Sequence, residues 1–403
     1  MTRSKMKFVL LVGDGMGDYP LEELGGKTPL EVAKTPNMDR IAGCHIGLVR
    51  TIPEGMPPGS DVANLSLLGY DPKKYHTGRA PLEAASMGVS LGEKDIAFRM
   101  NLVTLDHRQS GQIIMVSHSC GDISNQEGRA LVDALRENMQ DDGIRIYPGV
   151  AYRHLLVWKD GPLDAHTIPP HDVLGQNMAD YLSSSGQDPV LSLIRRSWDI
   201  LRDHPVNVER RKAGLKEGNS IWPWGQGRPP RLAKFSEKYG LRGGVISAVD
   251  LLRGMGISAG LMPIYVKGAT GYLDTNYKGK ADAALDSLKE LDFIFVHVEA
   301  PDEAGHAGSV EEKIQAIEAF DREVVGRVLE GLRRFEQFRI MVASDHLTPI
   351  PKRTHTDDPT LFAWASELDL AERMEGAFSE KGARSSGIYF ENGHDVMPMF
   401  LSI

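Results

Sequence analysis

The chain has few cysteines and no excess of positive charge. Its 403 residues include two cysteines, Cys44 and Cys120, which are too few for a disulfide framework and predict a reducing compartment. The net charge of −9 provides no basic field for a polyanion, so we expect no nucleic-acid partner. The acidic residues are spread along the chain, which fits solubility better than a particular binding partner.

Long apolar runs are also missing. No stretch reaches the length of a membrane-spanning helix, and the first apolar run, residues 7–12, stops at Gly13 and Asp14. A secretory signal would need a longer apolar core and a cleavage site with small residues. We therefore expect a cytoplasmic protein with no membrane partner. Internal repeats are not evident, and no GxxxxGK[ST] loop indicates an ordinary nucleotide site.

The two ends of the chain alternate strands with helices. Residues 7–12, 293–298 and 339–344 are apolar runs typical of buried parallel strands. Ser309 and Glu312 form a capping box before a helix whose apolar residues recur mostly every three or four positions. This pattern predicts an α/β fold with a largely parallel sheet flanked by helices. Such sheets place functional sites at the carboxyl ends of their strands.

The middle of the chain breaks this alternation. Three segments are predicted to be strands with turns: residues 109–120, 144–159 and 167–175. Ser124 and Glu127 form a second capping box and predict a helix. Residues 216–232, rich in Gly, Pro and Trp, predict a long ordered loop.

These changes of pattern predict two domains. Residues 1–76 and 241–403 are expected to form one α/β domain from both ends of the chain. Residues 77–240 are expected to form a smaller α/β domain inserted into it. The glycines near both predicted borders, in TGRAP and YGLRGG, suit the linkers that such an insertion requires.

Acidic and imidazole side chains follow the apolar strands of the predicted sheet. A single acid at such a place is ordinarily a helix cap or a turn residue, but several Asp and His residues together are harder to explain in that way. Carboxylates with imidazoles bind Zn²⁺, Mn²⁺ and similar ions, and six ligands suffice for two ions about 4 Å apart. Asp302 and His306 are expected in one loop. The other candidate ligands are Asp14, Asp345, His346 and His355.

Ser60 provides a candidate reacting group. Prolines and Gly59 precede it, and the following DVANLSLL can begin a helix, so Ser60 is predicted at a helix N-terminus. Backbone N–H groups and the helix dipole favour an anion at that position. Serine is also a common helix cap, which is the ordinary explanation for Ser60 alone. Next to a metal ion the same hydroxyl becomes an activated nucleophile.

With these motifs the chain resembles the cofactor-independent phosphoglycerate mutases, in their shorter archaeal-type branch, within the alkaline phosphatase superfamily. The matching motifs run nearly the length of the chain: GDGMGD, TPNMD, GSDVANLSLLGYDP, YHTGRAPLEAA, VEAPDEAGHAG, and ASDH followed by THTDDP. The resemblance implies an alkaline-phosphatase-like core with an inserted substrate or lid domain. It also implies interconversion of 3-phosphoglycerate and 2-phosphoglycerate through a phosphoserine.

The resemblance also implies a role for each residue of the motifs. Two divalent ions are expected, with Mn²⁺ as first choice and Zn²⁺, Co²⁺ or Mg²⁺ as alternatives. The implied ligands of one ion are Asp302, His306 and His355, and those of the other are Asp14, Asp345, His346 and Ser60. Ser60 is also the implied nucleophile.

The inserted domain should recognise a small phosphorylated acid. A carboxylate needs fixed guanidinium donors, and the candidates are Arg228, which is the first choice, Arg99 and Arg153. His118 and Asp122 are the other candidate substrate-binding residues. For each arginine a solvated surface charge is an equal alternative, and Asp122 could instead form a turn before the following helix.

Two other functions stay open. The stretches NSIWPWGQGRPPRL and GGVISAVDLLRGMG resemble a bacterial subgroup for which a homoserine kinase role has been proposed. A related phosphotransferase or a phosphatase is therefore the main alternative to a mutase. A non-catalytic metal-binding scaffold is disfavoured, because Ser60 accompanies all six candidate ligands. The sequence leaves the oligomeric state open.

Overall fold

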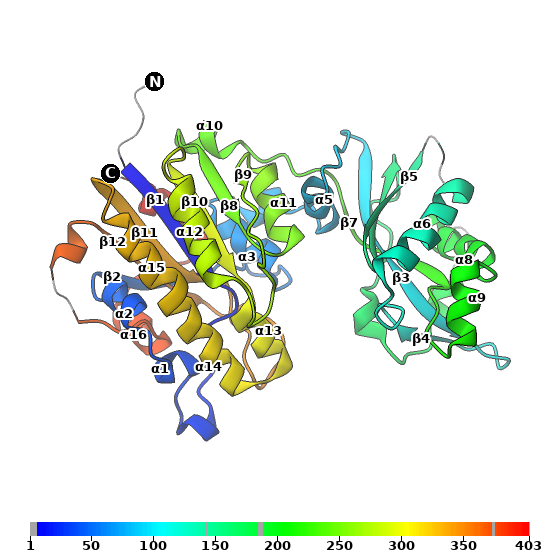
Figure 1. The fold of residues 1–403 in the computed structure, drawn as a ribbon, viewed down its shortest axis with the longest axis horizontal. Coiled ribbons are helices and arrows are strands. Elements are labelled where there is room, and N and C mark those ends of the chain that lie inside the picture. Colours follow the sequence, from blue (N-terminus) through cyan, green and yellow to red (C-terminus); the bar gives the residue numbers. More distant parts are fainter. Residues whose placement is uncertain (1–5, 140, 142, 184–187, 373–374, 403) are drawn as a thin grey trace. The chain divides into compact units, whose positions relative to one another are not determined.

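The chain folds into two compact units (Figure 1). The computed structural model describes residues 6–139, 141, 143–183, 188–372 and 375–402. Unit 1 combines residues 6–76 with the described residues from 231 onward, and unit 2 comprises residues 77–230. The sequence predicts the second border at residue 240 instead. Residues 231–240 belong to unit 1 because Phe235 stacks on Phe293 of its sheet, with 4.6 Å between ring centroids.

Unit 1 is built on an eight-stranded sheet in the order β13-β2-β12-β11-β1-β10-β8-β9. Its strands are β1 (Met6–Gly13), β2 (His45–Val49), β8 (Gly243–Ile246), β9 (Met262–Pro263), β10 (Phe293–Val298), β11 (Gln337–Ser344), β12 (Thr360–Ser366) and β13 (Tyr389–Phe390). Neighbouring strands are parallel, except that β12 is antiparallel to β11 and to β2. The predicted largely parallel sheet is confirmed.

Helices cover both faces of this sheet, which is why the apolar run of β1 is continuous. The helices of unit 1 are α1 (Pro29–Val32), α2 (Pro36–Ala42), α3 (Ser60–Leu67), α4 (Pro72–Tyr75), α10 (Phe235–Tyr239), α11 (Asp250–Ser258), α12 (Tyr277–Ser287), α13 (Ala300–Ala307), α14 (Val310–Ala319), α15 (Arg327–Leu332), α16 (Glu380–Ser385) and α17 (Val396–Leu401). On one face Val9 and Leu11 share a core with α12, α14 and α15 (Figure 1). On the other face Phe8 contacts Phe400 of α17.

Residues 300–307 form helix α13, where the sequence predicts a loop. Pro301 lies in the first turn, where its missing N–H has no intrahelical partner to lose. Gly308 ends the helix with a φ of 73°, a conformation that glycine adopts without strain. Because α13 is helical, the four-residue spacing places Asp302 and His306 on the same face.

Unit 2 is a smaller mixed domain with an antiparallel sheet. Its strands are β3 (Asp95–His107), β4 (Ile113–Ser117), β5 (Ile144–Val150), β6 (Arg153–Lys159) and β7 (Ser220–Gly227). Its helices are α5 (Ala80–Ser86), α6 (Asn125–Met139), α7 (Ala179–Ser183), α8 (Pro189–Leu201) and α9 (Pro205–Lys212). Phe98 and Met100 of β3 face the core under α6 and α8, whereas Ala97 faces α5. This alternation is expected of a strand with a packed core on each face.

Two local predictions in unit 2 are wrong. The Gly, Pro and Trp-rich stretch contains strand β7 rather than a loop, with Trp222 opposite Asn101 of β3. In the described part of the chain β3 is its one partner strand, so Pro223 does not interrupt a central ladder. Residues 167–175 form no strand; Pro170–Val173 is a 3₁₀ turn, because consecutive prolines cannot donate to a sheet.

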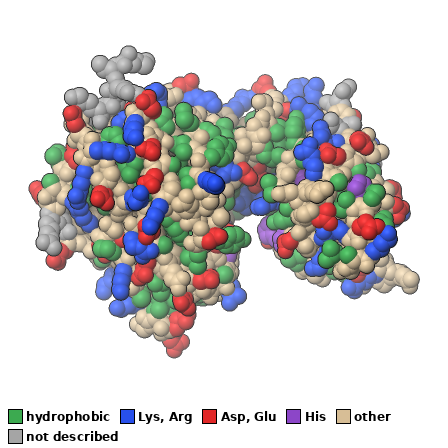
Figure 2. All heavy atoms as spheres, in the orientation of Figure 1, with side chains coloured by type: hydrophobic (Ala, Val, Ile, Leu, Met, Phe, Trp, Pro, Cys, Tyr) green, Lys and Arg blue, Asp and Glu red, His purple; other side chains and the backbone are tan. Residues whose placement is uncertain are grey.

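The predicted capping boxes lie at helix starts. Before α6, Ser124 N–H donates to Glu127 and Glu127 N–H donates to the Ser124 hydroxyl, at 3.0 and 3.3 Å. Before α14, Ser309 accepts from the N–H of Glu312. On the face shown in Figure 2, acidic and basic side chains are interspersed, as expected from dispersed charge. No helix among the described residues combines the length and apolar content needed to cross a bilayer.

Candidate metal centre

Three aspartates lie where parallel strands of unit 1 end. Asp14 directly follows β1, Asp345 directly follows β11, and Asp302 lies in the first turn of α13, just after β10. Strand β1 pairs in parallel with both β10 and β11, so the three carboxyl ends share one edge of the sheet. The fold therefore gathers acids from both ends of the sequence.

Asp14, Asp345 and His346 form one candidate ion site, with ligand atoms within 4.8 Å of one another. His346 Nε2 lies 3.3 Å from Asp14 Oδ1 and 3.6 Å from Asp345 Oδ2. All three residues are buried. The backbone N–H of Gly15 donates to Asp345 Oδ1 at 3.0 Å and orients that carboxylate. These residues are the three protein side chains that the resemblance implies for one ion besides Ser60.

Asp302, His346 and His355 form a second candidate ion site with the same 4.8 Å limit. His306 is close to it, because its Nε2 lies 3.3 Å from Asp302 Oδ2 and 3.0 Å from His355 Nε2. His346 belongs to both groups in the structure, whereas the resemblance implies separate ligand sets. All six predicted ligands thus lie in one cluster.

The composition and electrostatics of this cluster fit divalent cations. Burial raises the pKa of Asp14 well above its usual range, and the carboxylates of Asp345 and Asp302 raise it further. Asp14 Oδ1 is buried and has no hydrogen bond within the described residues. Cations held here would neutralise the crowded carboxylates and coordinate this oxygen.

Asp302 pairs with His306, which is partly exposed. Burial by itself would raise the pKa of Asp302, but hydrogen bonds with His306 and His355, together with the charges of His346 and His355, lower that pKa well below its usual range. The hydrogen bond to Asp302 raises the pKa of His306 to about 9. Without an ion, His306 is therefore protonated at neutral pH, and an ion that binds it must displace a proton.

Ser60 is the first residue of α3, as predicted, and its side chain reaches the cluster. Its Oγ lies 3.1 Å from His346 Nε2, the imidazole shared by both candidate sites. Ser60 is buried with a relative exposure of 8%. Gly59, the residue before it, takes an extended conformation with φ of 177° and starts the helix. The first N–H groups of α3 are free of intrahelical acceptors and can face an anion.

Two residues that the sequence analysis missed orient these groups. Asn64, one turn along α3, donates to Asp345 Oδ2 at 2.7 Å and to the Ser60 carbonyl at 2.8 Å. Thr348 donates its hydroxyl to Asp302 and lies 3.3 Å from His346 Nδ1. The four-residue spacing from Ser60 could have indicated Asn64, because it places both on one helix face. For Thr348 the sequence offers no such signal.

A buried charge network behind the cluster was also missed. Lys280 of α12 donates to Glu299 Oε2 at 2.6 Å and to the carbonyl of His297 at 2.8 Å. His297 lies between acids, with Nδ1 3.4 Å from Glu299 Oε1 and Nε2 3.4 Å from Asp14 Oδ2. Lys280 and His297 have no exposed surface. The sequence hides this network, because His297 lies inside an apolar strand and Lys280 follows another lysine, Lys278, on the same helix.

Lys280→Met should destabilise the protein, because it leaves the carboxylate of Glu299 buried without its cation. Losing one partner of a buried ion pair costs about 3–5 kcal/mol. The matched control is Lys278→Met on the same helix: the Lys278 side chain is 64% exposed and 3.7 Å from Glu323, so its loss should cost at most about 0.5 kcal/mol. Urea unfolding of both variants measures the difference. Equal stability of the two variants would show that Lys280 does not neutralise Glu299.

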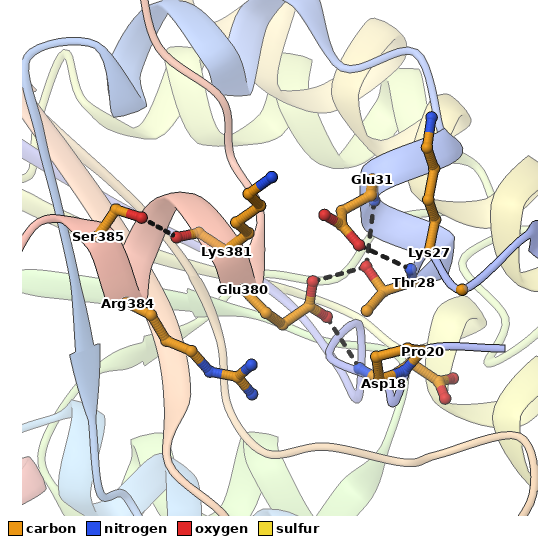
Figure 3. A pocket seen from close by; sticks show the side chains of 10 residues that line it. Asp18, Pro20, Lys27, Thr28, Glu31, Glu380, Lys381, Arg384 and Ser385 are labelled. Atoms are coloured by element: carbon orange, nitrogen blue, oxygen red, sulfur yellow. Dashed lines mark hydrogen bonds between the residues drawn. The ribbon is translucent and has the colours of Figure 1, made fainter.

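A cavity of about 510 Å³ lies beside the loop that carries Asp14, and contains no predicted ligand (Figure 3). At its wall, Glu380 of α16 accepts from the Asp18 N–H at 3.0 Å and from the Thr28 hydroxyl at 2.7 Å. The fully buried Lys313 pairs with Asp18 at 2.7 Å and donates to the Gly17 carbonyl. These contacts support the loop after β1, so we assign the cavity wall a structural role.

Unit 2 contains a separate basic cluster. The guanidinium of Arg99 stacks on Trp224 at 4.2 Å, and that of Arg153 lies 5.3 Å from the ring of Tyr152. His118 contacts the same Tyr152, with 5.8 Å between ring centroids. His171, which the sequence analysis missed, lies 5.4 Å from Trp224 and 6.3 Å from His118. Arginine and histidine side chains thus gather around two aromatic rings.

The positive groups of this cluster repel one another. Burial lowers the pKa of Arg99, Glu83 partly offsets this effect, and the positive charges of Arg79 and Arg153 lower it further. Burial likewise lowers the pKa of His171. Positive groups that depress one another's pKa are suited to bind an anion, which would relieve their repulsion.

Asp122 and Arg228 lie outside these ring contacts. Asp122 is exposed and has a φ of 55°, which favours its role as a turn residue. Arg228 is exposed on the segment that leaves β7, and its carbonyl accepts from the Thr77 hydroxyl at 2.6 Å. Substrate binding by either side chain stays a prediction.

The sheet and the Asp/His cluster at its edge define an α/β protein suited to metal-dependent phosphoryl transfer. A family model described as 2,3-bisphosphoglycerate-independent phosphoglycerate mutase matches residues 42–207, and one described as Type I phosphodiesterase / nucleotide pyrophosphatase matches residues 171–374.

Full-length relatives identify the family. The chain is 50% identical to the probable 2,3-bisphosphoglycerate-independent phosphoglycerate mutase of Geobacter sulfurreducens, over 98% of this chain and 100% of that protein. It is 49% identical to the mutase of Methanothrix thermoacetophila over the same shares. The chain belongs to the 2,3-bisphosphoglycerate-independent phosphoglycerate mutases, which are isomerases.

Solved structures agree with this assignment. The cofactor-independent phosphoglycerate mutase of Thermoplasma acidophilum superposes with a TM-score of 0.63 at 25% identity, covering 98% of this chain and 99% of that chain. The PH0037 protein of Pyrococcus horikoshii superposes with a TM-score of 0.79 at 29% identity, covering 98% and 96%. The predicted fold class is therefore confirmed.

Proposed function

We propose that this chain interconverts 3-phosphoglycerate and 2-phosphoglycerate, with Ser60 as the nucleophile. The observation that carries the proposal is the position of Ser60 Oγ, 3.1 Å from the imidazole of His346, which belongs to both candidate ion sites. A serine at a helix N-terminus beside a divalent ion can attack a phosphoryl group that the same helix binds. The names of relatives about 50% identical over the full length support this choice of substrate.

The cluster is proposed to hold two divalent ions, with Mn²⁺ as first choice and Zn²⁺, Co²⁺ or Mg²⁺ as alternatives. Bound ions would supply the positive charge that lowers the pKa of the Ser60 hydroxyl and neutralises phosphoryl oxygens. The proposed ligands are Asp14, Ser60, Asp345 and His346 for one ion and Asp302, His306 and His355 for the other.

The proposed reaction has two half-reactions at Ser60. In the first, Ser60 Oγ loses its proton and forms a bond to the phosphorus of 3-phosphoglycerate. The ester bond to the C3 oxygen breaks, and that oxygen takes up a proton. In the second, the C2 hydroxyl of the same glycerate attacks the phosphoserine, releases its proton and restores the Ser60 hydroxyl. The N-terminus of α3 stabilises the phosphoryl group in both steps.

Unit 2 is proposed to be the substrate and lid domain. Glycerate must stay bound between the half-reactions, and water must be kept from the phosphoserine, because hydrolysis would make the enzyme a phosphatase. His118 and Arg153, with the neighbouring Arg99, are the proposed groups that hold the carboxylate. The free thiols of Cys44 and Cys120 agree with the proposed cytoplasmic location.

Arg153→Ala should lower mutase activity about tenfold, equivalent to about 1.4 kcal/mol of activation free energy, because a bound carboxylate would lose a charged donor. Hydrolysis of a small ester such as 4-nitrophenyl phosphate needs only Ser60 and the ions and should be unchanged. Arg228→Ala is the comparison, since both arginines are exposed but only Arg153 contacts an aromatic ring of the cluster. Steady-state kinetics on both substrates measure the outcome. A larger loss from Arg228→Ala would assign carboxylate binding to Arg228 instead.

The function itself is tested with purified protein and Mn²⁺ in an enolase-coupled assay that detects 2-phosphoglycerate. A parallel reaction with homoserine and ATP tests the kinase alternative. Mutase turnover without the kinase reaction is the expected result. Phosphate release from 3-phosphoglycerate without 2-phosphoglycerate would make the enzyme a phosphatase and refute the proposal.

A further inference from the structure

The turn between β4 and α6 has a strained backbone. Three consecutive residues have positive φ angles: Cys120 at 54°, Gly121 at 61° and Asp122 at 55°. Glycine adopts this conformation freely, but two of the three residues carry a side chain that disfavours it. A strained backbone persists only where its surroundings hold it, and such places often lie at functional sites. His118 lies at the entrance of this turn.

One buried guanidinium holds the turn. Arg210 of α9 donates from Nη2 to the carbonyl of Cys120 at 2.7 Å, from Nη1 to Glu127 Oε1 at 2.9 Å and from Nε to the carbonyl of Lys216 at 2.7 Å. Its relative exposure is 5%. Because Glu127 forms the capping box of α6 with Ser124, Arg210 joins the turn, the start of α6 and the segment after α9.

The remaining contacts of the turn come from β4 and the core. The hydroxyl of Ser117 accepts from the N–H of Ser119 at 3.3 Å and from that of Gly121 at 3.0 Å. The side chain of Cys120 is fully buried, so the turn is anchored from inside. Arg210 is the cation among these anchoring contacts.

Hydrogen bonds connect His118, just before the turn, to the basic cluster of unit 2. The carbonyl of His118 accepts from Asn101 Nδ2 at 3.2 Å, and Asn101 Oδ1 accepts from the indole N–H of Trp224 at 3.0 Å. Trp224 is the ring on which Arg99 stacks. The turn on one side and Asn101 on the other therefore hold the backbone that carries His118.

We propose that Arg210 is a positioning residue for substrate recognition. It does not touch the substrate, because it is buried and its guanidinium is engaged in three directions. It keeps residues 120–122 in the strained conformation that presents His118 to the carboxylate and hydroxyl groups of a phosphorylated sugar acid. This inference rests on the proposed role of unit 2 in substrate binding.

The test compares Arg210→Met with Arg211→Met. Arg211 is the matched control, because it lies on the same helix, its side chain is 49% exposed and it pairs with Glu217 at 3.0 Å. In Arg210→Met, hydrogen exchange of residues 117–124 should speed up, and kcat/KM for 3-phosphoglycerate should fall about tenfold or more through misplacement of His118. Hydrolysis of 4-nitrophenyl phosphate should be unchanged. Arg211→Met should behave as the unmodified enzyme in all three measurements.

Arg210→Lys covers the case in which Arg210→Met does not fold. Lysine keeps the buried charge beside Glu127 but cannot donate in three fixed directions, so the same changes are expected in weaker form. The proposal is overturned if exchange of residues 117–124 is unaffected, if the turn loosens without loss of mutase activity, or if both reactions fall equally. If the unmodified enzyme had no mutase activity, the proposed function would fail and the substrate role of Arg210 with it. The exchange data would still decide whether Arg210 holds the turn.

Discussion

Ser60→Ala should lower the mutase rate about a thousandfold or more, equivalent to about 4 kcal/mol of activation free energy. Alanine has no oxygen to receive the phosphoryl group, so the covalent route is closed. The fold should persist, because the helix start depends on Gly59 and the residues after it. The enolase-coupled assay measures the rate, and mass spectrometry of the unmodified enzyme during turnover should find one phosphoryl group on the peptide that contains Ser60.

Ser66→Ala is the control for this substitution. Ser66 lies on the same helix and donates its hydroxyl to the carbonyl of Thr51, so its loss removes a structural hydrogen bond worth about 1 kcal/mol but no candidate ligand. Its mutase rate should stay near that of the unmodified enzyme. A Ser60→Ala enzyme with activity within about tenfold of normal would exclude Ser60 as the nucleophile.

Removing divalent ions should abolish the reaction, and adding Mn²⁺ should restore it. The structure contains two groups of candidate ligands that share His346, so two ions per chain are expected in metal analysis of the dialysed, reloaded enzyme. Asp302→Asn should leave one ion bound. The control is Glu303→Gln. Glu303 follows Asp302 on α13 and is exposed, so this variant should still bind two ions. One ion or none in the reloaded unmodified enzyme would rule out the two-ion scheme.

The same ion binding should depend on pH. In the ion-free chain the hydrogen bond to Asp302 raises the pKa of His306 to about 9. The protonated imidazole cannot be a ligand, so a proton competes with the ion at any pH below that value. Ion affinity should therefore rise as the pH increases from 7 towards 9 and fall in acid. Calorimetric titration in buffers of different ionisation enthalpy should detect the released proton; binding without proton release would remove His306 from the ligand set.

The predictions for unit 1 are correct where the same physical requirement determines both the sequence pattern and the fold. A strand covered on both faces must be apolar throughout, so β1, β10 and β11 can be read from the sequence. Short polar segments are less reliable. The stretch with Asp302 and His306 has glycines that suggest a loop, yet it forms α13, because a proline in the first turn and a glycine at the end are compatible with a short helix.

In unit 2, composition was misleading. Glycine and proline around Trp222 are typical of a loop, but residues 220–227 pair with β3 at an edge where Pro223 does no harm. Residues 167–175 show the opposite error, because they were predicted to contain a strand that consecutive prolines prevent. Local propensity is a weak prior that tertiary pairing overrides.

The sequence alone determined which side chains were candidates for the metal centre, because an acid or histidine after an apolar run is visible without a structure. Parallel strands end at one edge, and this rule alone brings Asp14, Asp302 and Asp345 together. Only the tertiary structure decided which neighbours orient them. His297 and Lys280 are ordinary residues in the sequence, and their contacts with Asp14 and Glu299 arise from separate elements of the fold. Hydrogen bonds act over about 3 Å, so a network of this kind exists only once the fold has placed its members.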